Sequence, residues 1–276
     1  MRLLKYFPLI ILVPALFVSS CSEGEKVPPA EDPDSNNLTV NDHDDYYTYA
    51  GEPEAVHYPN PLNILYNQGY VSAYDEVRGT PAWVAYKVFS VEEYITFDRP
   101  TRFSIDYRTG NLISHDDYTH SGYDRGHMAP NFAVVTRYGQ DAQIETFLMT
   151  NIIPQKPSLN RHWWQRLERL IARDYSEAYD NVWVITGPVY KEAGNWMHES
   201  KVKIPSHNFK IIKAEKNGLF EMKAFIVHQE VGGTEDHAPY LTSVNYIEEV
   251  TGLNFNPLMK QVLADSLESH QTAVMW

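Results

Sequence analysis

The sequence has a single cysteine, Cys21, among 276 residues. One cysteine cannot form an intramolecular disulfide, so a disulfide-held scaffold is excluded and stability has to come from a packed core. The composition suits such a core, because 43% of the residues are hydrophobic and 13% are aromatic. Length and composition together are typical of a globular protein of one or two domains.

Three common catalytic signatures are also missing. The chain contains no Gly-x-Ser-x-Gly, no His-Glu-x-x-His and no phosphate-cradling Walker loop. Serine hydrolases with a nucleophile elbow, zinc proteases and P-loop nucleotidases therefore find no support in the sequence.

Basic residues are few, with 23 Lys and Arg against 36 Asp and Glu and a formal net charge of −13. The excess of acid is uneven, because residues 22–55 hold ten Asp and Glu and one Lys, a local charge of −9. The first 21 residues carry +2, which leaves −6 for the stretch from residue 56 onward. This balance argues against tight, salt-driven binding of nucleic acid. It does not argue against an enzyme that has to release its product.

The N-terminus has the pattern of a targeting segment. Arg2 and Lys5 precede an apolar run, Leu9–Val18, that is too short for an ordinary membrane-spanning helix. Small residues and then Cys21 follow, which resembles a bacterial lipoprotein signal. This pattern predicts a lipidated Cys21 and an exported protein of the bacterial cell envelope, anchored in the membrane on the periplasmic side or at the cell surface. The alternative is an ordinary secretory signal with a chance cysteine.

Composition divides the chain into three regions. Residues 1–20 are predicted to be the lipoprotein signal peptide, residues 21–56 an acidic flexible tether, and residues 57–276 the globular domain. The second region is rich in Pro, Asp, Glu and Asn and poor in aliphatic residues, which favours a flexible chain. A disordered tail without a function has the same composition.

The globular region predicts a mixture of strands and helices without regular alternation, hence an α+β fold. Strands are expected at 83–88, 182–185, 209–214 and 219–228, with a strand and loop over 121–135. The pair Gly187-Pro188 is expected to end the second of these strands. Helices are expected at 159–175, 244–250 and 257–267.

Two segments combine residues that suit phosphodiester hydrolysis. In the first, His127 follows Gly126; histidine is the common general base near neutral pH, and glycine lets the backbone approach another group closely. In the second, Asn160 offers a neutral oxygen ligand to a hard cation such as Mg²⁺, which neutralises charge on a phosphate. Taken alone, His127 is as typical of a core histidine, and Asn160 of a helix N-cap.

Taken together, three motifs resemble the DNA/RNA non-specific endonuclease family, of the endonuclease G type. They are Asp124-Arg125-Gly126-His127, Asn151-x-x-Pro154-Gln155 and Asn160-x-x-x-Trp164-x-x-x-Glu168. The similarity runs from about residue 60 to 265, and the order of several motifs makes it more specific than any one of them. The resemblance implies a ββα-metal nuclease core, in which a mixed or antiparallel sheet is flanked by helices.

The resemblance also implies catalytic roles. His127 is expected to activate water, and Asn160 to be the single direct protein ligand of Mg²⁺, with Mn²⁺ or another divalent cation as alternatives. Glu168 is expected to act through metal-bound water. Arg102 lies where the family has an arginine that stabilises the transition state.

Other matched positions are expected to support the site. Asn151 is expected to hold or orient it, as a further member of the catalytic set. Asp124, Arg125 and Gly126 are expected to support the loop that positions His127.

Two departures from simple expectation concern the helix over 159–175. Secreted bacterial members of the family carry an arginine four residues after the glutamate, where this chain has Ala172 followed by Arg173. On a regular α-helix one residue turns the side chain by about 100°, which makes Arg173 a poor substitute. Asn160 and Glu168 are also separated by about 12 Å of helical rise, so they cannot both ligate one metal directly.

The predicted function is therefore a metal-dependent, lipid-anchored endonuclease that cleaves DNA and RNA to 5′-phosphate and 3′-hydroxyl ends. DNA and RNA are the expected substrates, the membrane is the expected anchor, and no protein partner is predicted. Two alternatives stay open: a non-catalytic nucleic-acid-binding or adhesion module on the same fold, and a phosphodiesterase for another substrate.

Overall fold

The structure is a computed structural model that describes residues 46–191, 195–197 and 201–270. These residues all belong to the unit Leu38–Trp276. The predicted signal peptide, Cys21 and the tether as far as residue 45 lie outside the described residues. Among the described helices, none has the length and apolar character needed to cross a bilayer.

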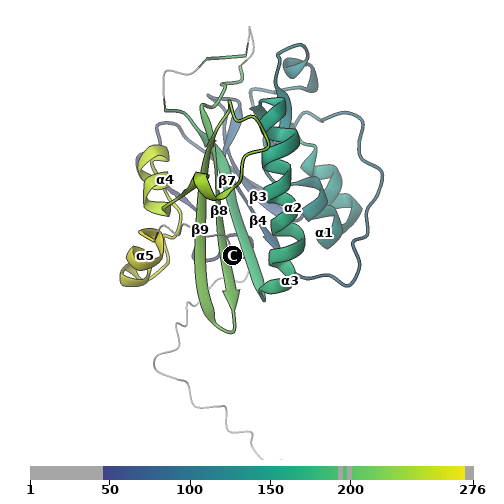
Figure 1. Ribbon diagram of the computed structural model, residues 1–276. Helices are drawn as coiled ribbons and strands as arrows, with labels where there is room; N and C mark the ends of the chain where they lie inside the picture. Colours follow the sequence, from purple (N-terminus) through teal and green to yellow (C-terminus); the bar gives the residue numbers. More distant parts are fainter. Residues whose placement is uncertain (1–45, 192–194, 198–200, 271–276) are drawn as a thin grey trace, which may run out of the picture. The chain divides into compact units, whose positions relative to one another are not determined.

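A seven-stranded antiparallel sheet forms the middle layer of the domain (Figure 1). Its strand order is β10-β9-β8-β7-β4-β3-β2. The strands are β2 (Asn63–Asn67), β3 (Tyr70–Asp75), β4 (Thr80–Val88), β7 (Asn181–Val189), β8 (His207–Lys216), β9 (Leu219–His228) and β10 (Leu241–Thr242). Strands β3, β4 and β7 are buried along nearly their whole length, because helices cover both faces of the sheet.

One face of the sheet carries α1 (Asn131–Thr146) and a helix that runs from Leu159 to Ala178, which we call the long helix (Figure 1). The long helix consists of η3 (Leu159–Trp164), α2 (Gln165–Leu170), η4 (Ile171–Tyr175) and α3 (Ser176–Ala178). Both η3 and η4 are π-helical. The other face carries α4 (Val244–Thr251) and α5 (Gln261–Glu268). Each face therefore has its own hydrophobic core.

Two short strands and the long helix form a small ββα unit. Strand β5 (Asp124–His127) pairs antiparallel with β6 (Ile152–Gln155), and the long helix follows β6 in the chain. Short 3-10 turns occur at η1 (His115–Tyr118), η2 (Met149–Asn151) and η5 (Ala238–Tyr240). The α+β class and the ββα core predicted from the sequence are confirmed.

The folded domain begins earlier than residue 57. Thr48 and Ala50 are buried, and β1 (Glu54–Ala55) pairs with β11 (Leu253–Asn254) near the C-terminal end. The tether was predicted to end at residue 56, but residues 46–56 already belong to the folded domain. This start was missed because the surrounding composition is acidic. Tyr47 and Tyr49 nevertheless pack against the core on the face that carries α4 and α5.

Two local predictions need correction. The strand β7 continues through Gly187-Pro188 as far as Val189, because glycine here permits close approach: a Cβ on Gly187 would lie 2.4 Å from the carbonyl oxygen of Ala82. The stretch 121–135 is strand and loop only as far as Pro130, where α1 begins. Helix α1 was missed because Gly139, with a φ of 86°, interrupts its helical geometry and its periodic pattern.

Candidate active site

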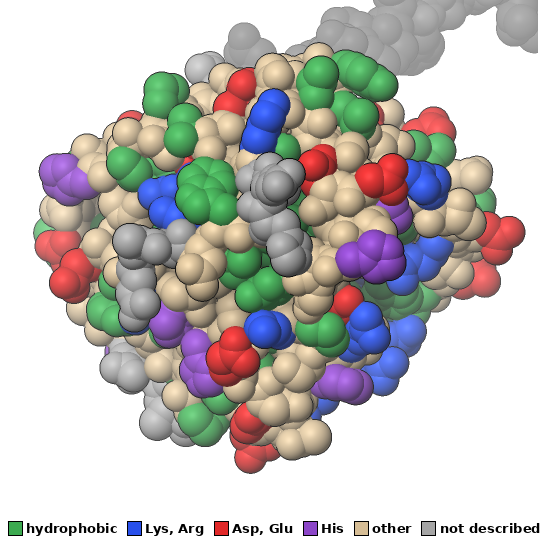
Figure 2. All heavy atoms as spheres, turned by 90° about the horizontal axis from the view of Figure 1, so that it is seen from above, with side chains coloured by type: hydrophobic (Ala, Val, Ile, Leu, Met, Phe, Trp, Pro, Cys, Tyr) green, Lys and Arg blue, Asp and Glu red, His purple; other side chains and the backbone are tan. Residues whose placement is uncertain are grey.

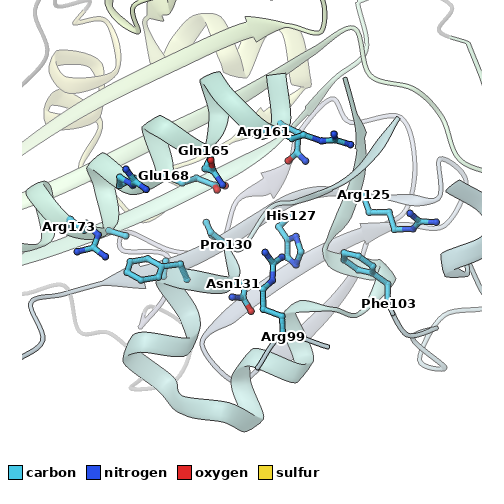
Figure 3. Close-up of a pocket in the computed structure, with 15 residues that line it drawn as sticks. Arg99, Phe103, Arg125, His127, Pro130, Asn131, Arg161, Gln165, Glu168 and Arg173 are labelled. Atoms are coloured by element: carbon cyan, nitrogen blue, oxygen red, sulfur yellow. The ribbon is translucent and has the colours of Figure 1, made fainter. Parts of the chain in front are cut away.

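A cavity of about 430 Å³ opens between β5, the start of α1 and the long helix. It brings together four residues predicted from the sequence, namely Arg125, His127, Asn160 and Glu168. In Figure 3, Gln165 and Glu168 project from the long helix toward His127 on the opposite wall. The remaining lining residues are Arg99, Phe103, Pro130, Asn131, Phe132, Ala133, Arg161, Gln165, Arg169, Ala172 and Arg173.

His127 ends β5 and is held between two aromatic rings. Its ring centroid lies 5.2 Å from that of Phe103 and 5.0 Å from that of Phe147. Burial, reinforced by the positive charge of Arg99, lowers the pKa of His127 to about 3. The Nε2 atom is buried and has no hydrogen-bond partner among the described residues. His127 is therefore neutral at physiological pH and able to accept a proton.

Gly126 is required by the packing beneath His127. A Cβ at this position would lie 2.1 Å from Oε1 of Gln155, which is fully buried on the paired strand β6. No side chain larger than hydrogen fits there without moving Gln155. Gly126 therefore supports the site by allowing β5 and β6 to pack closely.

Asn151 positions the backbone that follows His127. Its Oδ1 accepts a hydrogen bond from the Ala129 amide at 2.8 Å, and its Nδ2 donates to the carbonyl oxygens of Ala129 and Thr146 at 3.0 and 2.9 Å. The side chain is fully buried and does not line the cavity. Its expected role in holding the site agrees with this geometry, whereas direct contact with a substrate does not.

Asp124 orients the amide of Asn160. Asn160 Nδ2 donates to Asp124 Oδ2 at 3.0 Å, while Arg161 donates to both oxygens of the same carboxylate at 2.7 and 2.6 Å. Asn160 lies inside the first π-helical turn, and no side-chain capping bond is made at the start of that turn. The interpretation as an N-cap is therefore wrong. Asn160 Oδ1 has no hydrogen-bond partner among the described residues, so the geometry leaves it available to a ligand.

The π-helical turns change which residues of the long helix face the cavity. In such a turn the hydrogen bond joins residues i and i+5, so each turn holds more residues than in an α-helix. Arg173, five residues after Glu168, therefore lines the same cavity, next to the buried Ala172. Arg173 was expected to be a poor substitute on a regular α-helix, but the helix is π-helical at this position. Asn160, at the first π-helical turn, and Glu168 likewise line one cavity.

The cavity is positively charged, in contrast to the whole chain. Five of its lining residues are arginines and one, Glu168, is acidic, a local formal balance of +4. Three of these arginines make no hydrogen bond or ion pair with any described residue: Arg99, Arg169 and Arg173. Figure 2 shows Lys and Arg side chains gathered on the side of the molecule that carries α1 and α2, with Asp and Glu scattered.

The other two arginines are engaged by the protein. Arg161 binds Asp124, and Arg125 donates to the carbonyl oxygen of His115 and to Thr119 Oγ1. Arg173 makes no ion pair but contacts aromatic rings: its guanidinium group lies 4.6 and 4.9 Å from the ring centroids of Tyr94 and Phe132.

Comparison with known proteins agrees with this geometry. The model of the DNA/RNA non-specific endonuclease family matches residues 51–261. The chain belongs to this family. The prediction made from the three motifs is thereby confirmed.

Two relatives illustrate the similarity. The Danio rerio protein "Nuclease EXOG, mitochondrial" is 32% identical over 71% of this chain and 62% of its own length. The Homo sapiens protein "Endonuclease G, mitochondrial" is 28% identical over 75% of this chain and 74% of its own. The chain thus spans about three-fifths of the EXOG relative's length.

Among solved structures, the EndoG/EndoGI complex contains a chain with the same fold. The match has a TM-score of 0.65 at 26% identity and covers 75% of this chain and 91% of that chain.

The predicted location in the bacterial cell envelope is contradicted by these comparisons. The relatives in the non-specific endonuclease family are mitochondrial nucleases. The prediction depended on a short apolar run and one cysteine, a pattern too short to identify a compartment. That segment lies outside the described residues.

Arg102 is not brought into the cavity. Its guanidinium group is exposed and donates to both oxygens of Asp116 at 2.9 Å. Arg99, three residues earlier, lines the cavity beside His127 instead (Figure 3). Arg99 lies in the same Arg-Pro-Thr-Arg segment but was not among the predicted site residues, because spacing alone cannot show which arginine finds a carboxylate partner.

Proposed function

We propose that this protein is a metal-dependent nuclease that hydrolyses phosphodiester bonds in DNA and RNA without sequence specificity. One observation carries the proposal. A single cavity joins a neutral histidine, an available amide oxygen and three arginines that have no carboxylate partner among the described residues. Membership of the non-specific endonuclease family and the nuclease names of the relatives support it.

The donors around the cavity fit a hard divalent cation. Asn160 Oδ1 and the buried Glu168 Oε1 are oxygen acceptors without a hydrogen bond from a described residue. Mg²⁺ prefers oxygen ligands and keeps several waters, so one amide and one nearby carboxylate suffice. In the described part of the chain no three His, Cys, Asp or Glu residues cluster, unlike a typical protein zinc site.

In this proposal Asn160 would hold the cation directly and Glu168 would hold it through water. When bound, the cation neutralises charge on the phosphate and on the departing 3′ oxygen. Mg²⁺ is the expected ion, with Mn²⁺ as an alternative, since the oxygen donors suit both.

His127 then acts as the general base. Its neutral ring takes a proton from a water molecule while the water oxygen forms a bond to phosphorus and the bond from phosphorus to the 3′ oxygen breaks. The 3′ oxygen takes up a proton from solvent, which gives 5′-phosphate and 3′-hydroxyl ends. Burial and, to a smaller extent, the charge of Arg99 depress the pKa of His127 in the free protein. A phosphate bound to Arg99 offsets the effect of that charge and strengthens the base.

The unpaired arginines bind the phosphates of the substrate. Arginine donates in a planar fork that matches phosphate oxygens, and a guanidinium without a carboxylate partner is available for this contact. The local excess of positive charge explains how an acidic protein can bind a polyanion. The net negative charge of the whole chain predicts modest affinity for nucleic acid outside the cavity, which allows product release.

The test is cleavage of supercoiled plasmid and of RNA by the purified protein, with Mg²⁺ or with EDTA. Cleavage that needs Mg²⁺ and is lost in His127→Ala is expected. Equal cleavage by His127→Ala contradicts the role of the histidine. Binding without turnover points to a non-catalytic module, and preference for a small chromogenic diester points to another phosphodiesterase.

A further inference from the structure

A lysine is buried behind the wall of the cavity. Lys210 lies on β8, in the central sheet, and has no solvent exposure. Its Nζ is 3.8 Å from Glu168 Oε1 and donates a hydrogen bond to Tyr86 OH at 3.4 Å. The same Nζ lies 4.4 Å from the ring centroid of Trp164.

A buried ammonium group is costly unless a partner compensates its charge, and an apolar side chain fills the same space without this cost. The compensation for Lys210 is Glu168, whose side chain is 18% exposed and lines the cavity. The ion pair therefore connects the middle layer of the fold to the proposed active site.

Other charged and titratable groups share the cavity with this carboxylate: Arg161, Arg169 and Arg173 lie on the same helix, and His127 lies on the opposite wall. Arg99 acts on Glu168 from the loop after β4, and Tyr86 acts on it from β4 itself. Trp164 lies one turn earlier on the long helix, and Arg137 on α1 faces Tyr86. Lys210 is the only one of these cations that the described structure buries completely.

We propose that Lys210 is a positioning residue: its buried ammonium group holds the Glu168 carboxylate in place at the wall of the cavity. The consequence for cleavage depends on the proposed function. The coupling between Lys210 and Glu168 does not.

The first experiment is a double-mutant cycle on stability, which needs no nuclease activity. Urea unfolding is measured for wild type, Lys210→Met, Glu168→Gln and the double variant. Lys210→Met is expected to lower the unfolding midpoint, because it leaves a buried charge without its partner. In the Glu168→Gln background the same change is expected to be nearly neutral.

Equal loss in both backgrounds overturns the proposal, because Lys210 is then structural. If Lys210→Met does not fold, a folded double variant supports the coupling and an unfolded one contradicts it. Because this cycle reads only unfolding, it gives its answer even if the protein cleaves no nucleic acid.

The second experiment separates kcat from KM for plasmid cleavage. Lys210→Met is expected to lower kcat by about tenfold or more with little change in KM, because the arginines that bind phosphate are untouched. The matched control is Lys213→Met, which removes a lysine of equal burial from the same strand. The control should leave kcat unchanged; an unchanged kcat in Lys210→Met, or an equal loss in both variants, overturns the proposal.

Discussion

The two faces of the central sheet use a buried lysine in different ways. On the face that carries the long helix, Lys210 meets the carboxylate of Glu168 at the cavity. On the face that carries α4 and α5, Lys213 donates to the backbone carbonyl oxygens of Thr48, Tyr49 and Phe255 at 3.1, 2.9 and 3.0 Å. The first lysine pairs with a carboxylate that lines the cavity. The second connects residues near the two ends of the folded domain.

The cavity also carries buried polar atoms without a partner. His127 Nε2 and Asn131 Oδ1 make no hydrogen bond with a described residue. Buried polar atoms are normally paired, so unpaired atoms that line a cavity are those that a substrate, water or ion can use. The face that carries the cavity therefore combines packing with groups that are available for binding.

The largest effect that tests this division is expected from His127→Ala. Loss of a general base lowers kcat by about 10³-fold, within the usual range for such groups. The measurement is the rate of plasmid cleavage at saturating substrate with Mg²⁺. His207→Ala serves as the matched control, since His207 lies at the start of β8 and does not line the cavity. A similar loss of kcat in both variants would contradict a special role for the histidine at the cavity.

Asn160→Ala is expected to be next in size. Removal of the proposed ligand should raise the Mg²⁺ concentration for half-maximal activity by about 10- to 100-fold, the range seen when support of a metal is lost. Asn160→Asp keeps an oxygen ligand and should restore part of the affinity. A titration of cleavage rate with Mg²⁺ measures both, and an unchanged midpoint in Asn160→Ala argues against a ligand role.

Arg99 and Arg102 provide a comparison within one loop. Arg99→Ala should raise KM for nucleic acid by about tenfold, because a charge-assisted hydrogen bond to phosphate is lost. Arg102→Ala should change KM by less than about twofold, since an exposed ion pair contributes little. The reverse order would show that Arg102 leaves Asp116 and enters the cavity when substrate binds.

The smallest expected effect comes from Gly126→Ala. The added methyl group collides with Gln155, and such overpacking costs about 1–3 kcal/mol in the free energy of unfolding. Gly110→Ala is the control, because its Cβ would meet only the flexible carboxylate of Glu76 at 3.0 Å. Chemical denaturation measures both; equal stability of Gly126→Ala and wild type would show that β6 moves freely beneath the cavity.

Local sequence predicted much of the fold. The strands around 83–88, 182–185, 209–214 and 219–228 are present, and the helices at 159–175 and 244–250 are too. Runs of apolar residues and helical periodicity depend only on near neighbours in the chain. The irregular elements were missed for the same reason, since the kink at Gly139 and the π-helical turns η3 and η4 break that periodicity.

The sequence by itself determined the chemistry available to this protein: a histidine after a glycine, an asparagine and a glutamate on one helix, and the order of motifs that identifies the family. Only the tertiary structure decided which groups use that chemistry. It directs Arg102 to Asp116 and Arg99 to the cavity, brings Arg173 to the same wall, and places Lys210 behind Glu168. The reason is physical, because the partner of a charged side chain depends on burial and on residues distant in the chain.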